Sequence, residues 1–160
     1  MKKLIVAAVV MLLSAAVGGG NVKAQSYHGE LSGGWSIYPT EASVGCIGLH
    51  TVQGVQFGSH FSTGMGLGAE CMYDFDGGAV FCLPVYVDMK VYFGRRKVTP
   101  FITLDAGYAF GADDEMIGCI GAYYAPSFGL RYRKMSFQLG LEGYRDMCFL
   151  QFKIGVTFGR

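Results

Sequence analysis

Hydrophobic and polar residues alternate one by one along several stretches of the chain. In residues 79–93 every odd position is apolar, while the even positions include Cys82, Asp88, Lys90 and Tyr92. Because successive side chains of a β-strand point to opposite faces, this stretch predicts a strand with one apolar and one polar face. Three further stretches share the pattern: 60–72, 135–145 and 148–158.

Turn-rich pieces such as "YPTEAS", "DFDGG" and "GADDEMIG" divide the chain into segments of this kind. The segmentation predicts eight strands: 27–37, 46–57, 60–72, 79–93, 98–110, 120–133, 135–145 and 148–158. A tilted strand needs about 9–11 residues to cross a bilayer, so each is long enough. Pro84, Pro100 and Pro126 fall inside these segments. Proline removes a ladder donor, so we place all three at strand starts or bulges.

Composition narrows the fold class. The chain of 160 residues is 51% hydrophobic and 16% charged, with 25 glycines. A soluble antiparallel sheet has one core face and one solvent face rich in charge. Here the polar faces are poor in charge and rich in glycine, and the apolar faces are continuous. We therefore predict an all-β fold: an eight-stranded antiparallel up-and-down transmembrane β-barrel, apolar toward lipid and polar inside.

The predicted interior faces carry charged residues of both signs. Nine of them form a candidate lumenal charge network: Glu30, Glu70, Asp88, Lys90, Asp105, Arg131, Arg133, Glu142 and Lys153. Acids and bases are nearly balanced, as expected where buried charges must be paired. Side chains just fill the interior of an eight-stranded barrel, which predicts a packed lumen and no open channel. Gly64, Gly66 and Gly68 are expected to leave room for the long bases opposite.

The first segment has the features of a cleavable signal peptide. Lys2 and Lys3 precede an apolar stretch over 4–17, and Val22 and Ala24 suit a cleavage site. The domain prediction is therefore a signal peptide over 1–24 and a single barrel domain over 25–160. Cleavage removes three lysines and leaves fewer bases than acids. No basic stripe suggests a nucleic-acid partner.

The connections between strands sort by charge. With both termini in the periplasm, the longer connections face outside and carry most of the loop acids. The short turns carry bases: Arg95, Arg96, Lys97 and Lys134. Aromatic residues concentrate near strand ends, where barrels of the outer membrane carry aromatic girdles.

The five cysteines are scattered without C-x-x-C spacing, so the sequence contains no metal motif and implies no cofactor. Symmetric hairpins place Cys71 opposite Cys46 and also opposite Cys82, which makes a disulfide between Cys71 and one of them possible. Strict alternation points Cys71 outward and the other two inward. Free thiols are therefore the favoured interpretation, a disulfide of Cys71 with Cys46 or Cys82 is the alternative, and no cysteine is expected to be catalytic.

Several segments together resemble a known family. They are "HTVQGVQF", "GMGLGAE", "LPVYVDMKVYF", "KVTPFITLDAGYAFG", "YYAPSFGLRYR" and the aromatic last strand. The chain resembles the small eight-stranded outer-membrane barrels of Gram-negative bacteria, OmpA- or OmpX-like and often called porin-family proteins. Members often end on an aromatic residue, whereas Gly159 and Arg160 follow Phe158 here.

The resemblance implies a location in the cell outer membrane and a non-enzymatic role, either structural or in surface interaction. It implies contact with outer-membrane lipid and lipopolysaccharide, and with the secretion and barrel-assembly machinery during biogenesis. Two alternatives remain open. One is a lipid-modifying enzyme resembling lipid A acyltransferases or deacylases, although His28, His50 and His60 show no fixed serine or acid partner by spacing. The other is a soluble periplasmic barrel that binds an apolar ligand.

Overall fold

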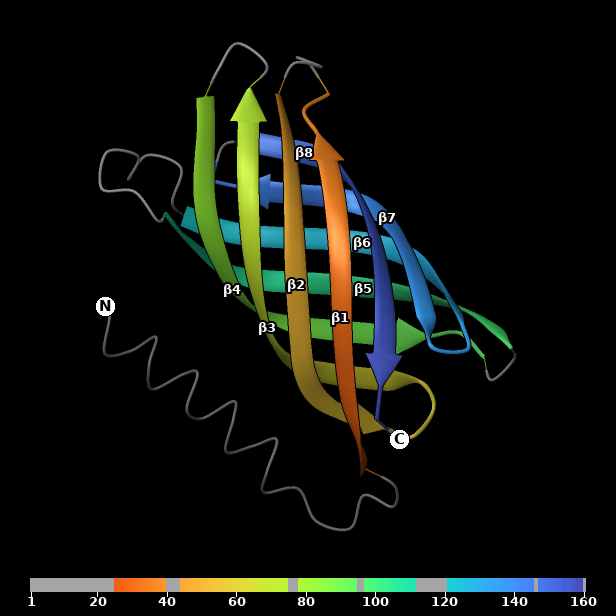
Figure 1. Ribbon diagram of the computed structural model, residues 1–160. Coiled ribbons are helices and arrows are strands. Elements are labelled where there is room, and N and C mark those ends of the chain that lie inside the picture. Colours follow the sequence, from red (N-terminus) through yellow and green to blue (C-terminus); the bar gives the residue numbers. More distant parts are fainter. Residues whose placement is uncertain are drawn as a thin grey trace, which may run out of the picture.

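The computed structural model describes residues 25–39, 44–74, 78–94, 97–111, 121–145 and 147–159. They form eight strands: β1 (Gln25–Ile37), β2 (Val44–Phe57), β3 (Phe61–Asp74), β4 (Gly78–Tyr92), β5 (Val98–Gly111), β6 (Gly121–Tyr132), β7 (Met135–Tyr144) and β8 (Met147–Phe158). Each strand pairs antiparallel with the next, and β1 also pairs with β8, so the sheet closes into a barrel (Figure 1). The predicted eight-stranded up-and-down barrel is confirmed, with strand ends within two residues of those expected.

The two ends of the barrel differ. At the terminal end, β1 begins, β8 ends, and two short turns over 58–60 and 133–134 join neighbouring strands (Figure 1). At the opposite end, the loop end, β1 ends near the start of β2. The predicted signal peptide over 1–24 lies outside the described residues. Within those residues, no helix is long and apolar enough to span a membrane.

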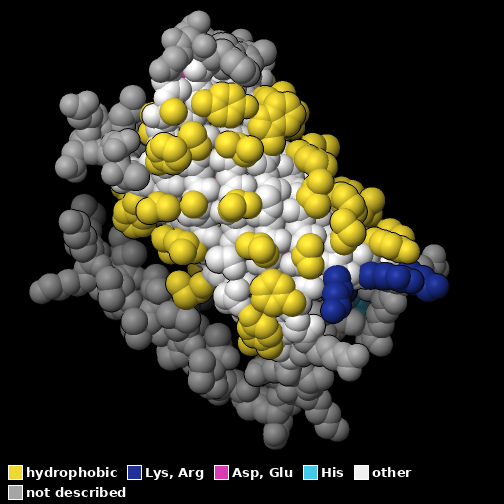
Figure 2. Space-filling model, in the orientation of Figure 1, with side chains coloured by type: hydrophobic (Ala, Val, Ile, Leu, Met, Phe, Trp, Pro, Cys, Tyr) yellow, Lys and Arg dark blue, Asp and Glu magenta, His cyan; other side chains and the backbone are white. Residues whose placement is uncertain are grey.

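Burial alternates along the strands as the sequence pattern predicts. In β4 the odd positions such as Phe81 and Val87 are exposed, whereas Cys82 and Asp88 are each 1% exposed. The outer wall is covered by hydrophobic side chains, and Lys and Arg gather at one rim of the visible face (Figure 2). Of the exposed residues in the eight strands, Asp74 alone is charged, and it is the last residue of β3.

The prolines lie elsewhere than expected. Pro84 and Pro126 sit inside β4 and β6 with no shift of register, rather than at strand starts or bulges. Each keeps its pairing on one side, with Ala109 and Leu104 respectively. On the other side the ladder lacks two residue pairs before it resumes in the same register. The cost of a missing N–H is thus confined to a short gap between two strands. Pro100 is the third residue of β5 and pairs with Leu130.

Candidate functional site

The polar interior of the barrel is the candidate site. Seven members of the predicted charge network are buried there, none more than 4% exposed: Glu30, Glu70, Asp88, Lys90, Asp105, Glu142 and Lys153. They come from six strands, and the alternation of each strand turns them toward the axis. They lie in three layers along that axis.

The lower layer, toward the terminal end, is built around Glu30 of β1. Its Oε2 accepts a hydrogen bond from Lys90 Nζ at 2.8 Å. Its Oε1 accepts hydrogen bonds from Gln138 Nε2 at 2.8 Å and Ser136 Oγ at 3.1 Å. A carboxylate can accept several bonds, so this one is well satisfied by donors from β4 and β7. The layer contains one acid and one base.

The middle layer places two acids directly opposite each other. Asp88 and Asp105 are register partners in β4 and β5, and Thr103 Oγ1 donates to Asp88 Oδ2 at 3.1 Å. Lys90 Nζ lies 3.2 Å from Asp88 Oδ2, and Lys153 Nζ lies 3.6 Å from Asp105 Oδ2. The two lysines approach from opposite sides of the lumen, which offsets the repulsion between the facing carboxylates.

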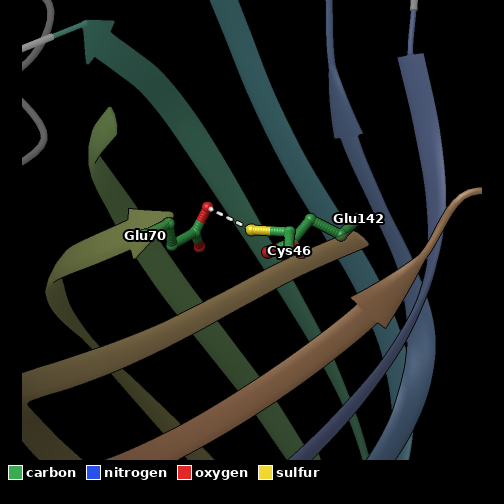
Figure 3. A group of neighbouring side chains, drawn as sticks. All are labelled: Cys46, Glu70 and Glu142. Carbon is green, nitrogen blue, oxygen red and sulfur yellow. Dashed lines mark hydrogen bonds between the residues drawn. The ribbon is translucent and has the colours of Figure 1, made fainter. Parts of the chain in front are cut away.

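The upper layer, toward the loop end, combines carboxyl groups, thiols and an imidazole. The thiols of Cys46 and Cys82 both donate to Glu70 Oε2, at 3.8 and 3.7 Å. His50 Nε2 lies 3.0 Å from Glu70 Oε1. The fifth member, Glu142, accepts hydrogen bonds from three neighbours: Ser36 Oγ at 2.9 Å, Tyr123 OH at 3.2 Å and Gln151 Nε2. The donor atoms of Cys46, Glu70 and Glu142 all lie within 4.8 Å of one another (Figure 3).

Aromatic rings close both ends of this interior. Toward the terminal end Tyr92 stacks on Phe101, with ring centroids 5.5 Å apart, and the Arg131 guanidinium lies 4.3 Å over the Tyr92 ring. Toward the loop end a chain of rings crosses the lumen from Tyr86 to Tyr123 to Tyr144, with successive centroids 5.3 Å apart. Phe149 extends the chain and is fully buried. The described interior is therefore occupied by side chains.

Two members of the predicted network are not in the buried layers. Arg133 is exposed in the turn between β6 and β7, where it adopts a φ of 56°, so its expected lumenal position is wrong. The alternation of apolar and polar residues does not show where a strand ends. Arg133 lies in the turn after β6, where side chains no longer alternate between the two faces of the sheet. Arg131 is half-buried at the rim, over Tyr92. The expected near-balance of charge is corrected accordingly: the three layers hold five acids and two lysines.

The glycines of β3 make room for different neighbours than expected. A Cβ at Gly66 would overlap the ring of Tyr86, its register partner. At Gly68 a Cβ would lie 2.7 Å from both His50 Nδ1 and Pro84 Cγ, and at Gly64 it would meet the backbone of β2. These glycines admit rings and close strand packing, and none of them accommodates a lysine or arginine.

The cysteine register differs by one residue from the predicted one. The turn over 58–60 has three residues, so Cys71 pairs with Ile47 and not with Cys46. Between β3 and β4, Cys71 pairs with Phe81 and not with Cys82. Cys71 points outward while the other two are buried inside. The candidate disulfides of Cys71 with Cys46 or Cys82 are therefore wrong, and Cys46, Cys71, Cys82 and Cys148 form no disulfide within the described residues. Cys119 lies outside the described residues.

The three histidines occupy different environments. His28 and His50 are 5% and 2% exposed in the lumen, and His50 faces both Glu70 and the Tyr86 hydroxyl, 3.3 Å from its Nδ1. His60 lies in the exposed turn over 58–60, with Ser59 Oγ 2.9 Å from its Nδ1. Sequence spacing missed the His50–Glu70 contact because the two residues lie on neighbouring strands. Both residues occupy inward-facing positions of the alternating pattern, and this could have indicated that they share the lumen.

The chain was compared with known proteins. No protein-family model matches it, and no curated protein does. A designed transmembrane β-barrel is 11% identical over 85% of this chain and 98% of its own, with a TM-score of 0.44. The outer-membrane protein Ail of Yersinia pestis is 12% identical, covering 82% and 99%, with a TM-score of 0.46. Neisserial surface protein A is 8% identical, covering 84% and 97%, with a TM-score of 0.45. These values are low, so nothing about activity or partners follows from them.

Proposed function

We propose that this chain is a small integral protein of the bacterial outer membrane, with a closed lumen and a non-enzymatic structural or surface-interaction role. The observation that carries the proposal is the outer wall. Apart from Gln53 and Asp74, the exposed positions along the eight strands carry apolar side chains or glycine, with Leu49, Val87 and Leu139 between 43% and 65% exposed. A soluble protein rarely leaves an apolar surface of this extent in water, whereas a barrel wall in lipid requires it.

Aromatic side chains at both ends of the wall support the same proposal. At the terminal end Tyr27 contacts Phe158, with ring centroids 6.4 Å apart, and Phe57 contacts Phe61 at 5.9 Å. Toward the loop end Trp35 Nε1 donates to the Tyr73 hydroxyl at 2.9 Å, and Tyr108 lies beside Phe110. Rings with a polar tip suit the boundary between lipid and water.

The proposal includes orientation and partners. Both termini lie on the periplasmic side, and the loop end faces outward. The exposed bases Lys97, Arg133 and Lys134 lie at the terminal end with the short turns. Membrane lipid and lipopolysaccharide surround the wall, and the secretion and barrel-assembly machinery deliver the chain. Buried ion pairs and aromatic rings fill the central lumen of the described barrel, which argues against a soluble barrel that binds an apolar ligand there.

Val87→Arg tests the position of the wall in lipid. Val87 lies midway along β4, and an arginine on the lipid face at the bilayer centre costs about 2–4 kcal/mol. Val98→Arg is the matched control, since Val98 is as exposed but begins β5 at the terminal end, where the cost is about 0–1 kcal/mol. Urea midpoints of the barrels folded in lipid vesicles measure both. Equal midpoints would show that the wall does not lie in lipid.

Enzymatic activity is tested separately. Lipid A from a deletion strain should have the same mass spectrum as lipid A from the parent strain. An added or missing acyl chain would establish the lipid-modifying alternative. The burial of His28 and His50 supports the non-enzymatic role, because neither ring reaches the lipid-facing surface.

A further inference from the structure

The upper layer of the lumen lacks the bases that balance the other two layers. Glu70 and Glu142 are each 2% exposed, and within the described residues neither forms an ion pair with a lysine or arginine. Lys90 is engaged by Glu30 and Asp88, and Lys153 by Asp105. Two adjacent buried carboxyl groups must be neutralised, either by protons or by a cation.

One oxygen of this layer also lacks a hydrogen-bond partner. Glu70 Oε1 is buried and accepts no hydrogen bond, although Oε2 of the same group accepts two from thiols. His50 Nε2 lies 3.0 Å away without the alignment of a hydrogen bond. Buried polar oxygens are nearly always satisfied, so an unsatisfied oxygen on a carboxyl group of this cluster points to a ligand.

The donor atoms are spaced as metal ligands are. Those of Cys46, Glu70 and Glu142 lie within 4.8 Å of one another (Figure 3). The sulfur of Cys82 is 3.7 Å from Glu70 Oε2. In a tetrahedral zinc site, bonds of about 2.3 Å to sulfur and about 2.0–2.2 Å to oxygen separate the ligand atoms by about 3.5 Å. Small side-chain movements would therefore bring the group to coordination distance.

We propose that Cys46, Glu70 and Glu142 bind a divalent transition-metal cation of the zinc class, with Cys82 as the fourth ligand. The mixture of thiols and carboxyl groups favours zinc over magnesium or calcium, which take oxygen ligands. The thiol protons pass to water as the sulfurs coordinate, and the ion then offsets two of the four negative charges of the two thiolates and two carboxylates. This revises the expectation of no metal site: the four ligands lie on β2, β3, β7 and β4, so no sequence motif links them.

Neighbouring residues hold the ligands in place. Ser36, Tyr123 and Gln151 all donate to Glu142, and His50 lies against Glu70. Such contacts orient coordinating carboxylates and histidines in metalloproteins, and here they fix one ligand before the ion arrives. Glu142 Oε1 accepts two of these bonds and Oε2 accepts one, so Oε2 keeps a further lone pair for the metal.

The loop end provides a route to this layer. A hollow of about 280 Å³ lies at the loop end, lined in part by Met72, Val80 and Phe149. Met72 is the register partner of Cys46, and Phe149 is the register partner of Glu142. The hollow therefore adjoins two of the ligands, and a cation would enter from that side.

Cobalt titration of the metal-stripped, folded barrel in detergent tests the proposal. Co²⁺ should bind with a sulfur-to-cobalt charge-transfer band in the near ultraviolet, and Zn²⁺ should displace it. Cys46→Ser and Glu70→Gln should each weaken binding at least about tenfold, and Cys82→Ser should weaken the band. Cys71→Ser is the matched control, because Cys71 follows Glu70 but faces outward and should leave binding unchanged. Heat-modifiable gel mobility verifies that each variant is folded.

Absence of the charge-transfer band in the folded wild type would overturn the site and leave protons as the neutralising charge. Equal cobalt affinity in the wild type and in Cys46→Ser would overturn it as well. An unchanged band in Cys82→Ser would overturn the assignment of the fourth ligand. The outcome is independent of the outer-membrane proposal, because the titration depends on the folded lumen and not on the lipid around the wall.

Discussion

Glu30 connects three strands inside the barrel through a single carboxylate. Glu30→Leu removes the acceptor for Lys90, Gln138 and Ser136 together, and leaves a buried ammonium group with Asp88 as its remaining acid. Loss of one partner of a buried, hydrogen-bonded ion pair costs about 3 kcal/mol or more. The free energy of unfolding, measured by urea denaturation in lipid vesicles, should fall by that amount.

The control for this variant is Asp74→Leu, at the exposed end of β3, where the change should stay within about 0.5 kcal/mol. Asp88→Leu should cost less than Glu30→Leu, although both acids pair with Lys90. Removing Asp88 also removes the repulsion on Asp105, its register partner. A larger loss for Asp88→Leu than for Glu30→Leu would mean that the facing acids do not repel each other.

Single residues show how far the sequence predicts the interior. Alternation correctly identified Asp88, Lys90 and Lys153 as inward, because parity is a local property of a strand. It failed for Arg133, because parity carries no information on where a strand gives way to a turn. It placed Glu70 and Glu142 inward but did not show which residues they contact in the upper layer. Contacts such as Glu70 with Cys46 depend on the register between strands, which one extra turn residue changes.

At the scale of elements, β3 and β4 pack closely because Gly66 leaves space for the ring of Tyr86. Gly66→Ala places a methyl group where the Tyr86 ring lies, and the ring cannot move freely because it packs on His50 and Tyr123. Overpacking of this kind costs about 1–3 kcal/mol. The urea midpoint of the folded barrel should fall accordingly. Gly78→Ala, where a Cβ meets no atom within 4 Å, should leave it unchanged.

Tyr86→Leu should partly rescue Gly66→Ala, since the smaller side chain frees the space that the methyl group needs. Without rescue, the cost would lie in the backbone at Gly66 and not in the ring. The sequence showed three alternate glycines in β3 but could not show which neighbours they admit. The residue that faces a glycine lies on the neighbouring strand. Its identity, and therefore its size, is known only once the register between the two strands is known.

The whole molecule combines an apolar wall with a lumen that aromatic side chains fill toward both ends, apart from the hollow at the loop end. Alternation along the chain predicted this architecture because one barrel wall separates the exterior from the interior at every strand, so each strand carries the same signal. The sealing was predicted in general from the number of strands. The residues that fill the two ends were not predicted. They are aromatic clusters around Tyr92 and Phe101 at one end and around Tyr144 and Phe149 at the other, and they come from four strands.

These two aromatic plugs determine what the barrel conducts. The wild type in a planar bilayer should show no large, steady current steps, because buried rings and ion pairs fill the path between the plugs. The double variant Phe101→Ala and Phe149→Ala takes one ring from each plug, both at most 1% exposed, and should admit more frequent brief openings. The matched control is Phe128→Ala with Phe152→Ala, two outward rings that are 53% and 42% exposed, and it should conduct like the wild type. Large, steady steps in the wild type would show that the lumen is open, and equal openings in both double variants would show that the plugs do not seal it.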